Sequence, residues 1–157
     1  MGWRANNKEN QKENQMATLT ILQGPPASGK STIARELHLK SPKDTVIVCK
    51  DSLRIGRGTY WIPSQEGYIA KLEYEAVRLA LDEGLNVIVD GTNLNPTILR
   101  QWKWLASKYQ AEIKYIKVDT PLDECLKRNS NPDRDHEVPE ETIRHFFKKY
   151  NLCTTTN

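Results

Sequence analysis

Eight residues, Gly24 to Ser31, read GPPASGKS and match the phosphate-binding pattern G-x-x-x-x-G-K-[S/T] throughout. A β-branched, apolar run at 18–23 precedes them and residues 31–37 have helical spacing, so the loop should join a strand to a helix, unlike an ordinary Gly/Pro turn. Glycines let consecutive N–H groups point at phosphate oxygens. Lys30 can then reach the β- and γ-phosphates, and the Ser31 hydroxyl can occupy one Mg²⁺ position. The pattern predicts a site for ATP, or another nucleoside triphosphate, with Mg²⁺. The residues predicted to bind it are Gly24, Ala27, Ser28, Gly29, Lys30, Ser31 and Thr32.

A carboxylate and an arginine follow the second apolar, β-branched run. Residues 45–49 read as a buried strand, Asp51 follows it, and Arg54 stands three residues further on. Since the carboxyl ends of parallel strands share one edge of a sheet, this pair should lie beside the phosphate loop, with Asp51 as the N-cap of a helix. Asp51 can accept the proton of an attacking hydroxyl, and Arg54 can hold a second anion on the acceptor. An N-cap next to a surface arginine is the alternative interpretation.

Two more arginines flank a polar connection that is poor in helix formers. The connection covers residues 131–137, and we predict a lid near residues 129–138. Arg128 and Arg134 can neutralise the charge that develops on a phosphoryl group during its transfer. These arginines, the phosphate loop and Asp51 together supply the parts that phosphoryl transfer needs.

A loop rich in glycine and aromatic residues covers 56–63 and should border the same crevice. Its Arg57, Tyr60 and Trp61 can contact a nucleotide by charge and stacking. They can equally pack onto the domain, and the sequence leaves both interpretations open.

Strands and helices alternate along the chain, which predicts an α/β P-loop kinase fold, a four-stranded parallel sheet flanked by helices. The last strand alternates polar and apolar residues, as an exposed edge strand does. Residues 17–157 are expected to form one domain, and the polar segment 1–16 a flexible tail. The expected strands are 18–23, 45–49, 85–90 and 112–118, and the expected helices are 31–37, a short one from 51, 65–83, 96–109, 121–129 and 138 to about 150.

The net charge, the cysteine content and the hydrophobic pattern exclude few functions. A net charge of +3 over 157 residues permits a nucleic-acid partner without requiring one. The three cysteines are far apart and form no C-x-x-C pair, which argues against a disulfide framework and a zinc site. With no signal peptide and no long apolar run, we expect a cytoplasmic protein without membrane contact, in the host cytoplasm if it is phage-encoded.

Four separated blocks carry a resemblance to a known family: GPPASGKSTIARE (24–36), KDSLR (50–54), GTNLNP (91–96) and LKRNS (126–130), the last followed by a helix that opens at Val138 and Pro139. Together they resemble the kinase domain of bacteriophage-type 5′-polynucleotide kinases, within the P-loop kinase superfamily. The resemblance implies that Lys30 and Ser31 bind ATP and Mg²⁺ and that Asp51 activates a 5′-hydroxyl. It also implies that Arg54 holds the adjacent 3′-phosphate of the acceptor and that Arg128 lies on the lid.

The resemblance further implies a contact between Thr92 and acceptor phosphate, but two neighbouring positions depart from the family pattern. The phage enzymes often have Asp immediately before this threonine, whereas this chain has Gly91, with Asp90 one residue earlier. We expect Asp90 to position metal-bound water or the acceptor. Pro132 aligns with the family's second lid arginine, and Arg134 is expected to substitute for it.

The expected function is ATP-dependent phosphorylation of 5′-hydroxyl ends of DNA or RNA, in repair or ligation. A phosphatase motif such as D-x-D-G-T is missing from the chain, so 3′-phosphatase activity is not expected. One alternative is a small-metabolite or sugar kinase, which has no use for an anion-binding Arg54. Another is a non-catalytic nucleotide-dependent binding module, which needs Lys30 but not Asp51.

Overall fold

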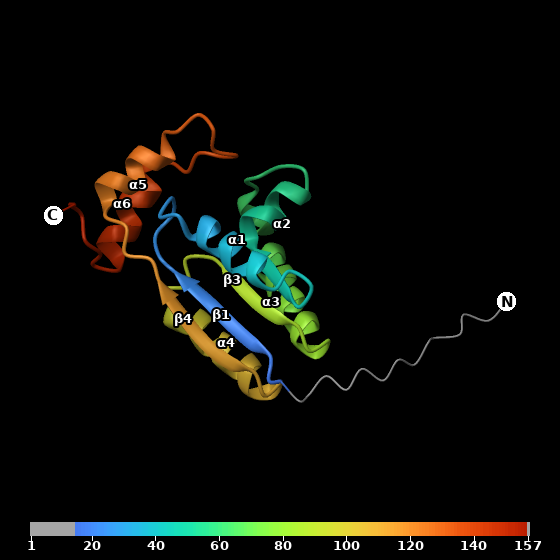
Figure 1. Ribbon diagram of the computed structural model, residues 1–157. Coiled ribbons are helices and arrows are strands. Elements are labelled where there is room, and N and C mark those ends of the chain that lie inside the picture. Colours follow the sequence, from blue (N-terminus) through green and yellow to red (C-terminus); the bar gives the residue numbers. More distant parts are fainter. Residues whose placement is uncertain (1–14, 157) are drawn as a thin grey trace.

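The computed structural model describes residues 15–156, built on a parallel sheet with helices on both faces (Figure 1). Of the tail predicted at 1–16, all but the last two residues lie outside the described part. No helix within residues 15–156 is long and apolar enough to cross a membrane. The elements are β1 (Thr18–Gln23), α1 (Lys30–Lys40), β2 (Thr45–Cys49), α2 (Lys50–Gly56), the 3-10 helix η1 (Pro63–Gln65), α3 (Glu66–Asp82), β3 (Asn86–Asp90), α4 (Pro96–Lys108), β4 (Glu112–Lys117), α5 (Leu122–Asn129) and α6 (Glu140–Lys149).

The four strands pair in parallel in the order β2-β3-β1-β4. In the register of the sheet, Leu19 of β1 lies opposite Val87 of β3 and Ile113 of β4. This order puts β1 and β3 in the centre and leaves β4 at an edge. The predicted α/β fold with a four-stranded parallel sheet is confirmed, and so is the edge position of the last strand.

Side chains that alternate along the central strands are buried on opposite faces of the sheet. Leu19 and Ile21 pack with residues of α3 and α4, and Trp102 of α4 is fully buried among them. Leu22 and Ile88 pack against α1 on the other face. Because both faces are covered, the carboxyl ends of β1 and β3 are held rigidly where the candidate site begins.

The helices α5 and α6 pack on each other beyond the carboxyl ends of β1 and β4 (Figure 1). Cys125, Ile143 and Phe147 form a small core between them, and Ala27 of the phosphate loop packs against it. Residues 130–139, here named the lid segment, connect the two helices. The helical pair is therefore attached to the phosphate loop through apolar contacts.

The start of α2 corrects one expectation. Cys49 is the N-cap, so Asp51 lies inside the first helical turn, and the prediction that Asp51 caps this helix is wrong. The reason is that β2 runs directly into α2, which gives the capping position to the last strand residue. The Asp51 side chain is instead engaged by Arg54, one turn further along.

Asn93 ties the loop after β3 to the core. Its Nδ2 donates to the Leu22 carbonyl oxygen at 2.8 Å, and its Oδ1 accepts from the Trp102 indole nitrogen at 3.0 Å. Gln23 Nε2 donates to the Asn93 carbonyl oxygen at 3.1 Å. The φ angle of Asn93 is 44°, a left-handed conformation that asparagine tolerates better than most residues. These bonds hold the loop against the end of β1.

We expect Asn93→Ala to lower the free energy of unfolding by about 3 kcal/mol, because buried donors and acceptors lose their partners and the left-handed backbone becomes strained. Asn95→Ala is the matched control, since Asn95 Oδ1 accepts a single bond, from the Thr97 N–H at 2.9 Å, as the N-cap of α4. Its loss should be about 1 kcal/mol. Urea-induced unfolding of both variants measures the difference. Equal losses would contradict the bridging role of Asn93.

Candidate active site

The phosphate loop runs from β1 into α1 along a backbone path that includes left-handed residues. Gly29, the N-cap of α1, has φ 96°, and Ala27 has φ 61°. A Cβ atom at Gly29 would also lie 2.8 Å from Nη1 of Arg128. Glycine at this position therefore serves both the turn and the close approach of α5.

Lys30 lies across the loop with only 8% of its surface exposed. Its Nζ donates to the Pro25 carbonyl oxygen at 2.6 Å and to Ser28 Oγ at 3.3 Å. Burial lowers the pKa of Lys30 to about 8, although the charges of Asp90 and Asp51 oppose the shift. A buried ammonium held by neutral oxygens is stabilised by any anion that reaches it, and phosphate is the anion this loop type accommodates.

Ser31 and Asp90 meet where neighbouring β1 and β3 end. Ser31 Oγ donates to Asp90 Oδ2 at 2.7 Å, and Asp90 is 6% exposed. Hydroxyl and carboxylate oxygens are hard ligands of the kind Mg²⁺ prefers, so this pair fits an ion that neutralises triphosphate charge. Both roles expected for Asp90, the positioning of metal-bound water and of the acceptor, stay predictions. No group of three or more His, Cys, Asp or Glu side chains that could hold a metal occurs within residues 15–156.

The Asp51 carboxylate is the centre of a second polar cluster. Its Oδ1 accepts from Arg54 Nη1 at 2.7 Å and from the Tyr60 hydroxyl at 2.9 Å. Its Oδ2 lies 3.5 Å from Nε2 of His136, a residue of the lid segment whose ring stacks on Tyr60 at 4.4 Å between centroids. Burial and the Asp51 charge raise the pKa of Tyr60, which keeps the phenol protonated as a donor. With Oδ1 engaged twice, Oδ2 is the oxygen that an attacking hydroxyl can use.

Arg54 is held by two carboxylates. Its Nε and Nη2 donate to the two carboxylate oxygens of Glu66 at 2.9 and 2.6 Å, in addition to the bond to Asp51. Burial opposes its charge, but the hydrogen bonds to Glu66 and the charge of Asp51 raise the pKa of Arg54 overall. The same bond lowers the pKa of Glu66. Nε, Nη1 and Nη2 each make one of these bonds, so Arg54 orients Asp51, and the second N–H of each Nη is the donor that it could offer to an anion.

Arg128 reaches from α5 to the phosphate loop. Its Nη1 donates to the Ser28 carbonyl oxygen at 2.9 Å, and Thr120 Oγ1 donates to the same oxygen at 2.7 Å. Its Nε bonds Glu124 at 3.1 Å, and 46% of the side chain is exposed. The Arg128 guanidinium thus lies near the N-terminus of α1. Phosphate bound by the loop would lie within its reach, as the predicted role of Arg128 requires.

Asn129 closes the base of the lid segment. It is 4% exposed, its Nδ2 donates to the Val138 carbonyl oxygen at 2.7 Å, and its Oδ1 accepts from the Val138 N–H at 3.0 Å. The same Oδ1 accepts from Arg134 Nη1 at 3.3 Å. Asn129 therefore holds both Val138 and Arg134 of the lid segment.

Thr92 lies between the phosphate loop and a cavity of about 70 Å³. Its carbonyl oxygen accepts from the Gly24 N–H at 3.0 Å. Lys50 and Glu73 also line the cavity, 3.7 Å apart between Nζ and Oε1. Burial raises the pKa of Glu73, which is only 3% exposed. A polar cavity next to Thr92 is compatible with the acceptor contact that the resemblance implies.

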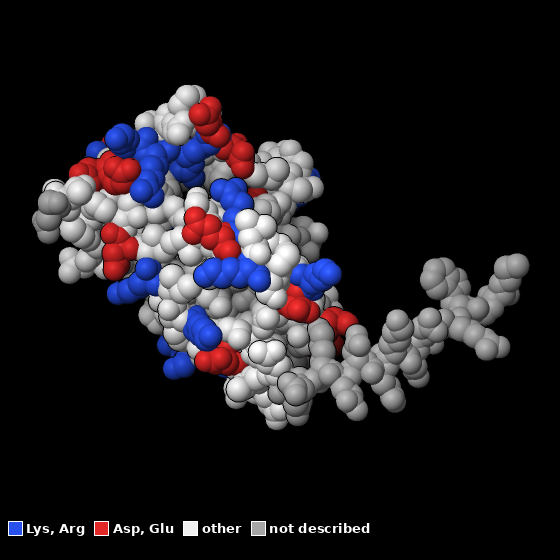
Figure 2. Space-filling view, in the orientation of Figure 1, with Lys and Arg blue, Asp and Glu red and all other residues white. Residues whose placement is uncertain are grey.

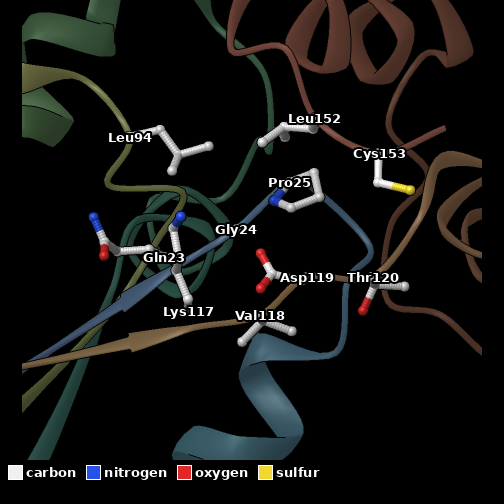
Figure 3. A pocket seen from close by; sticks show the side chains of 10 residues that line it. All are labelled: Gln23, Gly24, Pro25, Leu94, Lys117, Val118, Asp119, Thr120, Leu152 and Cys153. Carbon is white, nitrogen blue, oxygen red and sulfur yellow. The ribbon is translucent and has the colours of Figure 1, made fainter.

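A separate cavity of about 310 Å³ flanks the first residues of the phosphate loop (Figure 3). Pro25, Leu94 and Leu152 give it apolar walls, and the Asp119 carboxylate points into it. Of the predicted site residues only Gly24 lines it, so this cavity is distinct from the Asp51 cluster.

Basic side chains gather on the face of Figure 2 over the region of α5 and α6, with acidic side chains among them. Lys127 and Arg128 lie in the last turn of α5, and Lys148 and Lys149 in the last turn of α6. The charge near the lid segment is therefore mixed, and the local cations named above matter more than a broad positive field.

The structure brings the predicted residues to one end of the sheet, in two groups joined by the lid segment. Four contributors were missed by sequence reasoning. Tyr60 packs onto the domain, one of the two interpretations left open, through its hydroxyl bond to Asp51. Thr32 lies on the exposed surface of the first turn of α1. The missed contributors are Glu66, Thr120, Asn129 and His136.

The sequence and the fold are similar to those of known proteins. The family model described as an AAA domain matches residues 19–152. The L-seryl-tRNA(Sec) kinase of Methanococcus maripaludis is 29% identical, covering 87% of this chain and 54% of the relative. A protein of Autographa californica nuclear polyhedrosis virus, provisionally named a bifunctional polynucleotide kinase/RNA ligase, is 27% identical over 84% of this chain and 20% of the relative. A chain in the structure of the Pnkp1/Rnl/Hen1 RNA repair complex superposes with a TM-score of 0.75 and 27% identity, covering 90% of this chain and 46% of that chain.

The fold and the phosphate loop define a P-loop domain of the kinase type. The chain belongs to the AAA domain family, and it is similar to a protein provisionally named a polynucleotide kinase/RNA ligase and to a chain of an RNA repair complex. It spans about half the length of the M. maripaludis relative and of the repair-complex chain, and a fifth of the viral protein.

Lys30→Met is expected to stabilise the nucleotide-free protein by on the order of 2 kcal/mol at pH 7, because it removes a desolvated charge. The pKa is about 8 in the folded protein and 10.5 without perturbation, so the unfolded chain binds more protons in this range and wild-type stability rises with pH. The advantage of the variant should therefore be full below pH 8 and shrink toward pH 10.5. Urea unfolding at pH 7 and pH 9.5 measures it, with Lys30→Arg as the control that keeps the charge. An advantage that does not change with pH would contradict a buried, titrating Lys30.

Proposed function

We propose that this protein transfers the γ-phosphoryl group of ATP to the 5′-hydroxyl of a DNA or RNA strand. The main support is the Asp51 carboxylate, which Arg54 and Tyr60 hold in place by hydrogen bonds. Its charge acts on the Lys30 ammonium and partly offsets the lowering of the Lys30 pKa by burial. A base and a phosphate cradle in electrostatic contact support an in-line transfer between them. The family and the fold support the more general part of the proposal, that this P-loop kinase domain binds a nucleotide.

On this proposal each group has one task. Asp51 accepts the hydroxyl proton at Oδ2, and Lys30 and Arg128 offset charge on the transferring phosphoryl group. Ser31 would ligate Mg²⁺ and Asp90 would position a water molecule bound to that ion, which would neutralise charge on the phosphates.

The acceptor side needs its own anion contacts because the acceptor carries phosphate. Arg54 and Thr92 take the phosphate next to the reacting hydroxyl, and Arg134 acts from the lid segment as a second cation. The relatives named above support a nucleic-acid acceptor, since one is provisionally named a polynucleotide kinase/RNA ligase and another belongs to an RNA repair complex. The 29% identity to an L-seryl-tRNA(Sec) kinase favours a second candidate, a hydroxyl carried on tRNA.

Incubation with γ-labelled ATP and Mg²⁺ should place label on 5′-hydroxyl oligonucleotides of DNA or RNA and on nucleoside 3′-monophosphates. Seryl-tRNA and simple sugars are the competing acceptors in the same panel. Label on seryl-tRNA alone, or on sugars alone, would contradict the proposal, and ATP binding without any transfer would favour a non-catalytic module. Strands that end in a 3′-phosphate should keep it.

A further inference from the structure

Trp61 is an exposed aromatic side chain next to the Asp51 cluster. It follows α2 in the loop before η1, and 57% of its surface is exposed. The Arg54 guanidinium carbon lies 5.7 Å from the centre of the indole, a cation–π contact that orients the ring. One indole is therefore held beside the candidate base while much of it faces solvent.

The other two candidates for a base contact in this loop are engaged internally. Arg57 donates through Nη2 to the carbonyl oxygens of Thr59 at 2.8 Å and Tyr60 at 3.1 Å, which closes its own loop. The Tyr60 hydroxyl donates to Asp51, and its ring stacks on His136. Of the three side chains, Trp61 is the one left with a face to offer to a ligand.

We propose that Trp61 is a stacking platform for an unpaired nucleobase of the acceptor strand. A base in a single strand presents a flat π-face, and an indole is a preferred partner for it, whatever the sequence. Arg54 contacts both groups, because its Nη1 donates to Asp51 Oδ1 at 2.7 Å and its guanidinium carbon lies 5.7 Å from the indole centre, so it offers a positive charge to the phosphate of a strand that stacks on Trp61. This platform rests on the proposed function for the identity of its ligand.

The position of Trp61 matches the first nucleotides of a strand whose 5′-hydroxyl lies against Asp51. The indole centre lies 5.7 Å from the Arg54 guanidinium carbon, so a strand whose phosphate contacts Arg54 passes beside Trp61. An unpaired base of that strand can turn its flat face to the indole.

Fluorescence anisotropy without ATP tests the platform independently of phosphoryl transfer. The probe is a short single-stranded 5′-hydroxyl oligothymidylate labelled at its 3′ end. Trp61→Ala should weaken binding roughly 5- to 150-fold, and Trp61→Phe should retain most of the affinity. Trp104→Ala is the matched control, because Trp104 is 56% exposed with Lys108 Nζ 5.1 Å from its ring, yet lies on α4, well away from α2 in Figure 1. This control should bind like the wild type.

A second probe whose first two nucleotides are abasic separates stacking from a general loss of structure. Wild type should bind it as weakly as Trp61→Ala binds the full strand, and Trp61→Ala should lose nothing further. Three results would each overturn the platform: Trp61→Ala binds the full strand as tightly as the wild type does, the wild type and Trp61→Ala lose the same affinity on the abasic probe, or the wild type binds no strand. Binding that depends on Trp61 without any 5′-transfer would instead overturn the proposed function and leave the platform standing.

Discussion

The candidate site is built around one constraint, the burial of the Lys30 ammonium at the point where the loop after β1 enters α1. Neutral oxygens of Pro25 and Ser28 bind the ammonium, and burial lowers its pKa. Such a charge is costly to keep, and the carboxylates of Asp90 and Asp51 partly offset the cost. Phosphate can replace the neutral oxygens, so the loop is arranged for an anion before one arrives.

The lid segment links the two sides of the crevice. At one end, Arg128 of α5 bonds the Ser28 carbonyl oxygen of the phosphate loop. At the other, His136 lies against Asp51 and stacks on Tyr60, while Asn129 closes the segment at its base. These contacts connect α5, the lid segment and the Asp51 cluster, so the donor and acceptor sides of the site are joined through one short segment of chain.

The sequence predicted what local pattern determines. The phosphate loop, the four strands and the edge position of β4 follow from motif spacing and hydrophobic period, and they are confirmed. Contacts between distant segments were not predictable, because no local pattern indicates that His136 meets Asp51 or that Asn93 joins Leu22 to Trp102. The expectation that Asp51 caps α2 was wrong because β2 runs directly into α2, so that Cys49 takes the N-cap position.

Asp51 as the base is the central claim, and the variant Asp51→Asn tests it most directly. Asparagine keeps the size of the side chain and an oxygen for the Arg54 and Tyr60 bonds, but it cannot take a proton. With a 5′-hydroxyl oligonucleotide as acceptor, single-turnover transfer should fall by roughly 10²- to 10⁴-fold while ATP affinity stays at the wild-type level. Transfer at the wild-type rate, or a loss explained by ATP affinity alone, would contradict the account.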